Sequence, residues 1–124
     1  YRPALLLEKA SRRNAVNRAA QAGRLEVVKW LHSSSPSLFT KHTMNYAAGG
    51  GHLHVVQWLH ARGHRVEDSS AMVAAVWNGH LHVVKWLHAG GHWLVDGRLS
   101  TKAAMSLAAT RGHLDVVEYL RPFQ

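Results

Sequence analysis

Histidine is the residue whose number and spacing first suggest chemistry in this chain. The decapeptides GHLHVVQWLH (51–60) and GHLHVVKWLH (79–88) differ by one letter, and each carries three of the 11 histidines. Because neutral imidazole is a common metal ligand, a metal site is the first hypothesis to test. His52 and His54 are two residues apart, which on a helix points their rings to opposite faces, whereas chelation from one helix needs an i, i+4 spacing. We therefore expect no metal site.

Catalytic chemistry finds even less support in the residue types. The chain has 7 acidic residues and no cysteine, and it contains neither a phosphate-binding loop nor a Gly-x-Gly-x-x-Gly fingerprint. We expect a protein that is not an enzyme and needs no cofactor. The lack of cysteine fits a reducing compartment, so an intracellular location, cytoplasmic or nuclear, is expected. No apolar segment is long enough to predict a transmembrane helix. Since the chain does not begin with methionine, we expect it to be part of a longer protein.

The histidine-rich phrase belongs to a repeat that sets the positions of all these residues. Four segments share a Gly-x-Leu-x-Val-Val frame, and their glycines are 28, 28 and 33 residues apart. Each glycine follows an alanine-rich segment with an alanine four residues before it. The four segments are GRLEVVKWLH (23–32), GHLHVVQWLH (51–60), GHLHVVKWLH (79–88) and GHLDVVEYLR (112–121), and the alanines are Ala19, Ala47, Ala75 and Ala108.

Both halves of each unit are predicted to be helices. In the second copy Leu53, Val56 and Leu59 recur at helical spacing, and alanine in the preceding segment is the best helix former. The glycine between the halves can take the positive φ that a tight helix–helix turn requires. One pair of short helices cannot bury its apolar stripe alone, so the pairs should stack side by side. An all-α solenoid of antiparallel helix pairs is the predicted fold.

These residues resemble the ankyrin repeat, whose second half reads Gly-His-Leu-x-Val-Val-x-x-Leu. The resemblance divides a single domain (1–124) into units 13–40, 41–68, 69–101 and 102–121, with 1–12 as an N-terminal cap or the remnant of a preceding repeat. The Thr-Pro-Leu-His opening of the family is degraded and its proline is absent, so each inner helix should begin with a looser first turn. The 28-residue steps are about five residues short of the family repeat, which predicts short or stunted hairpin loops.

The resemblance also implies structural roles for the repeated histidines and aromatic residues. It places His52, His80 and His113 in inter-repeat hydrogen bonds, and the recurring aromatic position between adjacent outer helices. That position is held by Trp30, Trp58, Trp86 and Tyr119. His54 and His82 fall on the solvent-facing side near a helix N-terminus, where a protonated ring is unfavourable. We therefore expect the two central repeats to lose stability on acidification.

Residues that break the repeat are better candidates for function. Trp77 lies in the two-residue slot before the third glycine, which in this family points into the concave groove. It is a candidate anchor, because tryptophan is enriched at binding hot spots; the alternative is that it folds over Gly49 and Gly50 of its neighbour. The predicted partner-binding residues are Trp77, Asn78, Arg111, Thr110, Lys102, Lys41, Gln21 and Arg13 on the concave surface, with Arg65 and Trp93 as loop candidates.

The leading functional prediction is a non-catalytic scaffold that binds a protein partner through the concave groove. The net charge of +8 favours an acidic partner. Two alternatives stay open: binding of nucleic acid or another polyanion through the basic N-terminal surface, and a purely architectural segment of a longer array. No membrane association is expected. No clear cap follows the last outer helix, so the chain is predicted to be a monomer or to pack end to end through an uncapped terminus.

Overall fold

A computed structural model describes residues 3–64, 70–90 and 100–123 of the chain. Within these ranges eight α-helices and two short 3₁₀ helices occur, and no β-strand. The helices are α1 (Pro3–Ala22), α2 (Leu25–Ser34), α3 (Lys41–Gly49), α4 (Leu53–Ala61), α5 (Ser70–Trp77), α6 (Leu81–Ala89), α7 (Thr101–Thr110) and α8 (Leu114–Leu120), with η1 (Pro36–Leu38) and η2 (Arg121–Phe123). Their types and bounds confirm the predicted all-α fold.

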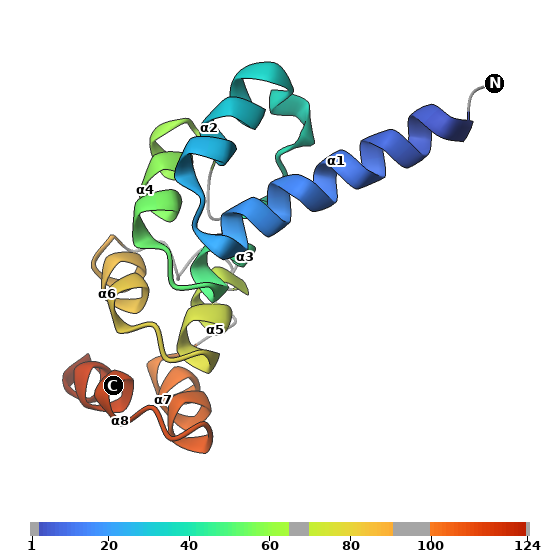
Figure 1. The fold of residues 1–124 in the computed structure, drawn as a ribbon. Coiled ribbons are helices and arrows are strands. Elements are labelled where there is room, and N and C mark those ends of the chain that lie inside the picture. Colours follow the sequence, from blue (N-terminus) through green and yellow to red (C-terminus); the bar gives the residue numbers. More distant parts are fainter. Residues whose placement is uncertain (1–2, 65–69, 91–99, 124) are drawn as a thin grey trace.

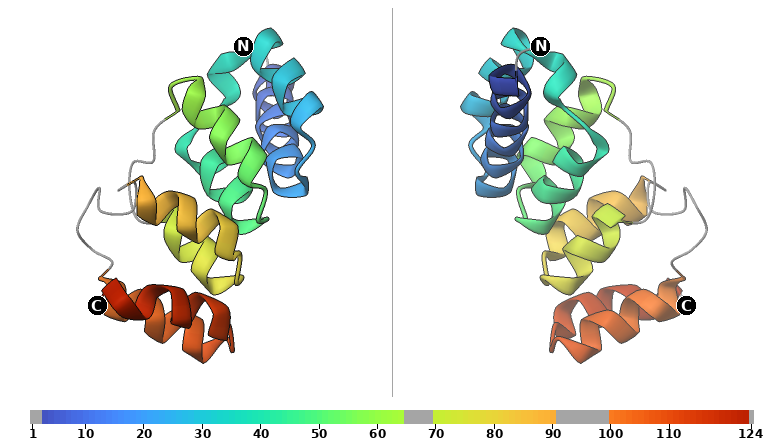
Figure 2. Two further views of the ribbon diagram at one scale, coloured as in Figure 1. Left: turned by 90° about the vertical axis from the view of Figure 1, so that its left-hand side faces the viewer. Right: turned by 90° about the vertical axis from the view of Figure 1, so that its right-hand side faces the viewer.

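The helices form two layers of four, because each odd-numbered inner helix pairs with the even-numbered outer helix that follows it (Figure 1). Inner helices α1, α3, α5 and α7 contact one another in chain order, and so do outer helices α2, α4, α6 and α8. The side views show the four pairs stacked one after another (Figure 2). This arrangement confirms the predicted solenoid of antiparallel helix pairs. Among the helices that the structure describes, none could span a lipid bilayer.

A glycine with positive φ makes the tight turn inside every pair. Gly23, Gly51, Gly79 and Gly112 have φ of 75°, 77°, 74° and 77°, a left-handed conformation that side chains with a Cβ disfavour. The turn also satisfies the carbonyls at the inner helix end, since the backbone N–H of His52 donates to Ala47 O at 3.1 Å. The left-handed backbone conformation of this turn therefore explains why a glycine recurs in every unit.

Two inner helices begin with a side-chain cap. The Thr40 hydroxyl accepts a hydrogen bond from the backbone of His42, and Ser100 accepts one from Ala103. Such caps satisfy backbone N–H groups that a helix leaves unpaired at its start. The buried Thr43 hydroxyl in turn donates to Asn17 Oδ1 at 3.0 Å and so joins α3 to α1. Whether the first turns are looser than in a proline-bearing repeat stays a prediction.

The core lies between the two layers and combines small inner residues with branched outer ones. Alanines and methionines of α3, α5 and α7 pack against the valines and leucines of the outer helices. One part of the core had no counterpart in the repeat: the Ser-rich turn at 33–42 contains η1 and buries Leu38 and Phe39. Residues 3–12, expected as a cap or remnant, continue α1 without a break, and this part of α1 projects beyond the stack (Figure 1).

Candidate functional site

Neighbouring units contact one another along the outer helices, and we call this row of contacts the seam. In it a histidine of each later unit packs against the glycine turn of the unit before it. The imidazole rings of His52, His80 and His113 lie where a Cβ on Gly23, Gly51 and Gly79 would be, with ring atoms 2.3 to 2.4 Å from that position. His113 Nε2 is 2.9 Å from the carbonyl oxygen of Trp77, to which it donates an inter-repeat hydrogen bond. The hydrogen bond that the family resemblance implied is therefore present at His113.

A second seam contact couples the last turn of each outer helix to the aromatic ring of the next. The rings of His32 and Trp58, of His60 and Trp86, and of His88 and Tyr119 meet edge to face at 5.1, 5.2 and 5.6 Å between centroids. His88 Nδ1 also lies 3.2 Å from the Tyr119 hydroxyl. The packing predicted for these aromatic residues is confirmed in units two to four.

Trp30 corrects that prediction in the first unit. It occupies the same repeat position as Trp58 and Trp86, yet 66% of its surface is exposed. The position faces the preceding outer helix, and no outer helix precedes α2 in the described chain. The aromatic residue at this repeat position is therefore buried by the preceding unit and not by its own helix.

The placement of His52 and His54 also differs from the prediction. Their rings were expected on opposite faces of a helix, but their centroids are only 5.9 Å apart. His52 is the residue before α4, with φ −98° and ψ 81°, so helical geometry does not apply to it. His54 is exposed and its Nε2 lies 3.2 Å from the carbonyl oxygen of Gly23. Within the described ranges no three histidine or acidic side chains gather as a metal site would require.

A histidine pair that was not predicted joins the first two units near the C-terminal ends of α2 and α4. His32 Nε2 and His64 Nε2 are 3.0 Å apart, so one ring donates a hydrogen bond to the other. The pair contacts Phe39 and Trp58. Burial, and then the neighbouring His32 imidazole, lower the pKa of His64, and burial lowers the pKa of His88. Both histidines are thus held preferentially in the neutral form.

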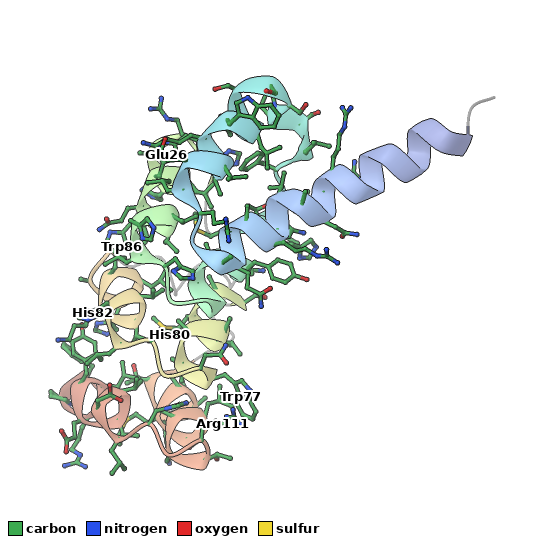
Figure 3. The ribbon with its side chains drawn as sticks, in the orientation of Figure 1. Glu26, Trp77, His80, His82, Trp86 and Arg111 are labelled. Atoms are coloured by element: carbon green, nitrogen blue, oxygen red, sulfur yellow. The ribbon has the colours of Figure 1, made fainter. Side chains whose placement is uncertain are left out.

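On the opposite layer, Trp77 and Arg111 form a pair across the last two inner helices. Trp77 ends α5 with 40% of its surface exposed, and the Arg111 Cζ lies 4.7 Å from the centre of its ring, within cation–π range. Figure 3 shows the two side chains together, on the other side of the molecule from Trp86 and His82. The structure therefore pairs Trp77 with the following unit; among the nearest neighbours of Gly49 and Gly50 it does not occur.

A hollow of about 390 Å³ opens on the same layer and crosses the first three units. Amide groups and rings line the hollow, and no carboxylate is among the lining groups. The lining residues are Gln21 from α1, His42, Asn45, Tyr46 and Gly49 from α3, Ala74 from α5, and Asn78. The Tyr46 side chain is 43% exposed. Hydrogen-bonding groups flanking an exposed aromatic ring are suited to binding a polypeptide segment.

The predicted site residues fall into three groups. Gln21 and Asn78 line the hollow, and Asn78 Nδ2 donates to Ala74 O at 2.9 Å. Trp77 and Arg111 form the stacked pair beside it. The third group is exposed on the inner helices or at their ends and does not line the hollow; it consists of Arg13, Lys41, Lys102 and Thr110. The Thr110 hydroxyl donates a hydrogen bond to Ser106 O of its own helix. Arg65 and Trp93 lie outside the described residues.

Five residues of the hollow were not predicted: His42, Asn45, Tyr46, Gly49 and Ala74. The signal for Tyr46 was present in the repeat alignment, because Arg18, Ala74 and Leu107 hold the same position in the other units. An aromatic ring found in only one of four copies is not required by the repeated architecture. The same departure from the repeat had singled out Trp77 and Trp93 from the sequence.

Comparison with known proteins agrees with the geometry. A family model described as ankyrin repeats (3 copies) matches residues 16–92 and again residues 43–123. The two matches overlap because a three-copy model fits the first three units and also the last three. A search of curated proteins found no match.

Proposed function

Because the chain belongs to the ankyrin repeat family, we propose that it is a non-catalytic scaffold that binds a protein partner through the concave face of its inner helices. Ankyrin repeats are generally protein–protein interaction modules, and the family is typically non-catalytic. The hollow lined by Gln21, Tyr46 and Asn78 is the observation that carries the proposal. It lies on three successive units, as a site for an extended segment would.

The side chains on this face suggest the chemistry of the partner. Amide groups of Gln21, Asn45 and Asn78 can both donate and accept hydrogen bonds, as the main chain of a bound peptide requires. The exposed Tyr46 ring adds an apolar surface to the lining of the hollow. Arg111, stacked on Trp77, presents guanidinium N–H groups that pair well with a carboxylate. We therefore propose a partner segment with an acidic side chain near Arg111.

The proposal is tested by capturing partners on four forms of the chain. Wild type, Tyr46→Ala, Trp77→Ala and Trp30→Ala are immobilised, and the bound proteins are quantified by mass spectrometry. Trp30→Ala is the matched control, because it removes an exposed tryptophan from the outer layer. Proteins held by wild type and Trp30→Ala but lost from Tyr46→Ala and Trp77→Ala would support the concave site. Equal capture by all four folded forms would contradict it.

Binding of nucleic acid stays a second candidate, since Arg12, Arg13 and Arg18 are exposed on α1. Such binding would weaken steeply with salt, because displaced counterions dominate its free energy. Retention of single-stranded or duplex oligonucleotides at low salt, lost in an Arg12→Gln/Arg13→Gln variant, would support it. An absence of retention would dispose of it and leave the concave site unaffected.

A further inference from the structure

A second hollow lies on the outer layer, where the last turns of α2 approach α4. It measures about 380 Å³ and is lined by Lys29, His32 and Ser33 of α2, by Trp58 of α4, and by Arg62, the residue after α4. We call this site the basic hollow. No carboxylate is among its lining groups, and it shares no residue with the hollow on the concave face. It is therefore a separate site with a chemistry of its own.

Among the three contacts between successive outer helices, one combines these groups. Where α4 meets α6, the equivalents of Lys29, Ser33 and Arg62 are neutral, and where α6 meets α8 a single lysine remains. The equivalents are Gln57, Ala61 and Gly90 in the first case, and Lys85, Ala89 and Phe123 in the second. The Lys85 Nζ lies 5.6 Å from the centre of the Tyr119 ring. The repeated architecture therefore does not require the basic hollow.

The basic hollow lies within two neighbouring units, so it does not depend on what precedes residue 1 or follows residue 124. A unit packed before the first one would leave the positions of Lys29 and Ser33 open, because their equivalents Gln57 and Ala61 are exposed although a unit precedes theirs. The site therefore belongs to the surface of this chain in either case.

The stability of the helix ends accounts for one basic residue in each outer helix, but not for this group. A basic side chain near a helix C-terminus complements the helix dipole. His32, His60 and His88 already supply one in the last turns of α2, α4 and α6. Lys29 and Arg62 are additional to them, and their charges point to a ligand of negative charge.

The side chains around the basic hollow are held in place by contacts within the fold. The Arg62 Cζ lies 5.4 Å from the centre of the Trp58 ring. The His32 ring meets the same indole edge to face and shares a hydrogen bond with His64. The Ser33 hydroxyl donates to Lys29 O at 3.1 Å, so the donors for a ligand come from Lys29 and Arg62. A site whose groups are held before binding loses less conformational entropy when the ligand arrives.

We propose that the basic hollow binds an organic phosphate monoester, either a phosphorylated protein side chain or a small phosphorylated molecule. Such a group carries a charge of about −1.5 to −2 and three acceptor oxygens, which match two cationic donors from different helices better than a singly charged carboxylate does. The volume of the hollow falls in the range of about 300 to 1,000 Å³ that is typical of ligand sites, so a bare phosphate ion fills only part of it. The partly buried Trp58 ring gives the organic part an apolar contact. The proposal is independent of any partner on the concave face.

The acidic residues of the first two units set the competing charges. They are Glu26, Glu67 and Asp68. Glu26 Oε1 lies 3.8 Å from Lys29 Nζ, but the Glu26 side chain is 90% exposed, and exposed ion pairs contribute little. A phosphate group is therefore expected to displace this contact. Glu67 and Asp68 lie outside the described residues, and the experiment keeps both of them in the chain.

The test is an NMR titration of the 124-residue chain with four ligands at physiological ionic strength. The ligands are a glycine-rich peptide with one phosphoserine, the same peptide with serine, the same peptide with glutamate, and glycerol phosphate. The variants are Lys29→Gln, Arg62→Gln and Glu26→Gln, with Lys85→Gln as the matched control. Lys85 holds the repeat position of Lys29 and is exposed, and its replacement changes the net charge by the same amount. The spectra also show that each variant is folded.

We expect at least one of the two phosphate ligands to shift the amide signals of residues 29–33 and 58–62, and the serine peptide to shift none. Lys29→Gln and Arg62→Gln should each weaken this binding about tenfold, as the loss of one charge-assisted hydrogen bond predicts. Lys85→Gln should leave it unchanged, and Glu26→Gln should strengthen it about twofold. The tighter of the two phosphate ligands identifies the source, a protein side chain or a small molecule.

Three results would overturn the proposal. One is the absence of binding by both phosphate ligands up to millimolar concentration. Another is an equal loss of affinity in Lys85→Gln and Lys29→Gln, because the effect would then come from net charge alone. The third is a glutamate peptide that binds as tightly as the phosphoserine peptide, which would assign the basic hollow to carboxylates.

Discussion

Along the seam between the outer helices each unit makes the same contact as the one before it, whereas the concave face presents different side chains in every unit. The seam repeats a histidine over a glycine and a second histidine against an aromatic ring. The slots on the concave face hold Gln21-Ala22, Gly49-Gly50, Trp77-Asn78 and Thr110-Arg111. In the helix pairs the repeated residues therefore build the seam, and the residues that depart from the repeat on the inner helices are the candidates for binding a partner.

The difference has a physical origin. A seam residue contacts only the adjacent unit, so one solution to its packing serves every interface of a stacked array. Most residues in the slots before the glycines are exposed, so their identity is only weakly constrained by stability. The following changes test whether the two regions separate in this way, from the largest expected effect to the smallest.

Gly51→Ala is expected to destabilise the fold most, by about 3 kcal/mol. The added Cβ would meet the His80 ring, and alanine is strained at φ 77°. Gly112→Ala has the same φ without a neighbour within 4 Å among the described residues, so only the backbone term of about 1 kcal/mol should apply. Chemical denaturation of both variants measures the difference. Equal losses would mean that the histidine ring contributes nothing to the seam.

Trp86→Ala should cost about 2 to 3 kcal/mol of unfolding free energy, less than truncation of a fully buried aromatic residue. Trp86 is partly buried and packs on His60. Trp30→Ala at the equivalent position should change stability by about 0.5 kcal/mol or less, because its side chain is mostly exposed. Thermal unfolding of the two variants gives the comparison. A similar loss at both positions would show that the aromatic residue stabilises its own helix and not the seam.

Trp77→Ala should leave the unfolding free energy within about 0.5 kcal/mol of wild type and weaken partner binding by about 2 kcal/mol, or some thirtyfold. Trp77 is exposed, and its side chain contacts Arg111 on the concave face. Isothermal titration against a captured partner measures the second effect. A large fall in stability with unchanged affinity would assign Trp77 to the architecture.

Acidification from about pH 8 to about pH 5.5 should lower the melting temperature modestly. The pKa of His64 and that of His88 are lowered in the fold by burial, from 6.5 in the unfolded chain. The unfolded state therefore binds more protons, and stability present above pH 6.5 is lost as the pH falls below it.

His64→Gln should reduce this pH dependence while glutamine keeps a hydrogen bond available to His32. His82→Gln tests the other origin predicted from the sequence, protonation of an exposed histidine near the start of an outer helix. If only His64→Gln reduces the pH dependence of the melting temperature, the effect arises in the seam. If only His82→Gln reduces it, the effect arises at the surface. A melting temperature that rises on acidification would contradict both origins.

Much of the fold could be predicted because its signal repeats. Helix periodicity, the glycine spacing and the alanines appear four times, so the layers and their order followed from the letters alone. The features that were missed occur once. Leu38 and Phe39 enter the core from a loop, His64 meets His32 across 32 residues, and Tyr46 joins a hollow with residues of two other units.

The errors share one cause: the position or burial of a residue was predicted from its own helix, without the contribution of the neighbouring units. His52 was placed by helical geometry, although it precedes the helix and its ring turns back to the glycine of another unit. Trp30 was judged buried from its place on the apolar stripe, although burial there depends on the preceding unit. Trp77 and Arg111, both named from the alignment, were found side by side only in the structure.

The sequence by itself determined the repeating unit, because helix periodicity and the need for glycine at a positive-φ turn are local properties that each unit of this chain satisfies with its own residues. The tertiary structure decided which copies of a repeated residue are covered and which single residues meet. Those outcomes depend on what the neighbouring units place opposite each position, and that information is distributed over residues about 30 positions apart. The proposed binding surface belongs to this second kind, since its residues come from separate helices that only the stacking brings together.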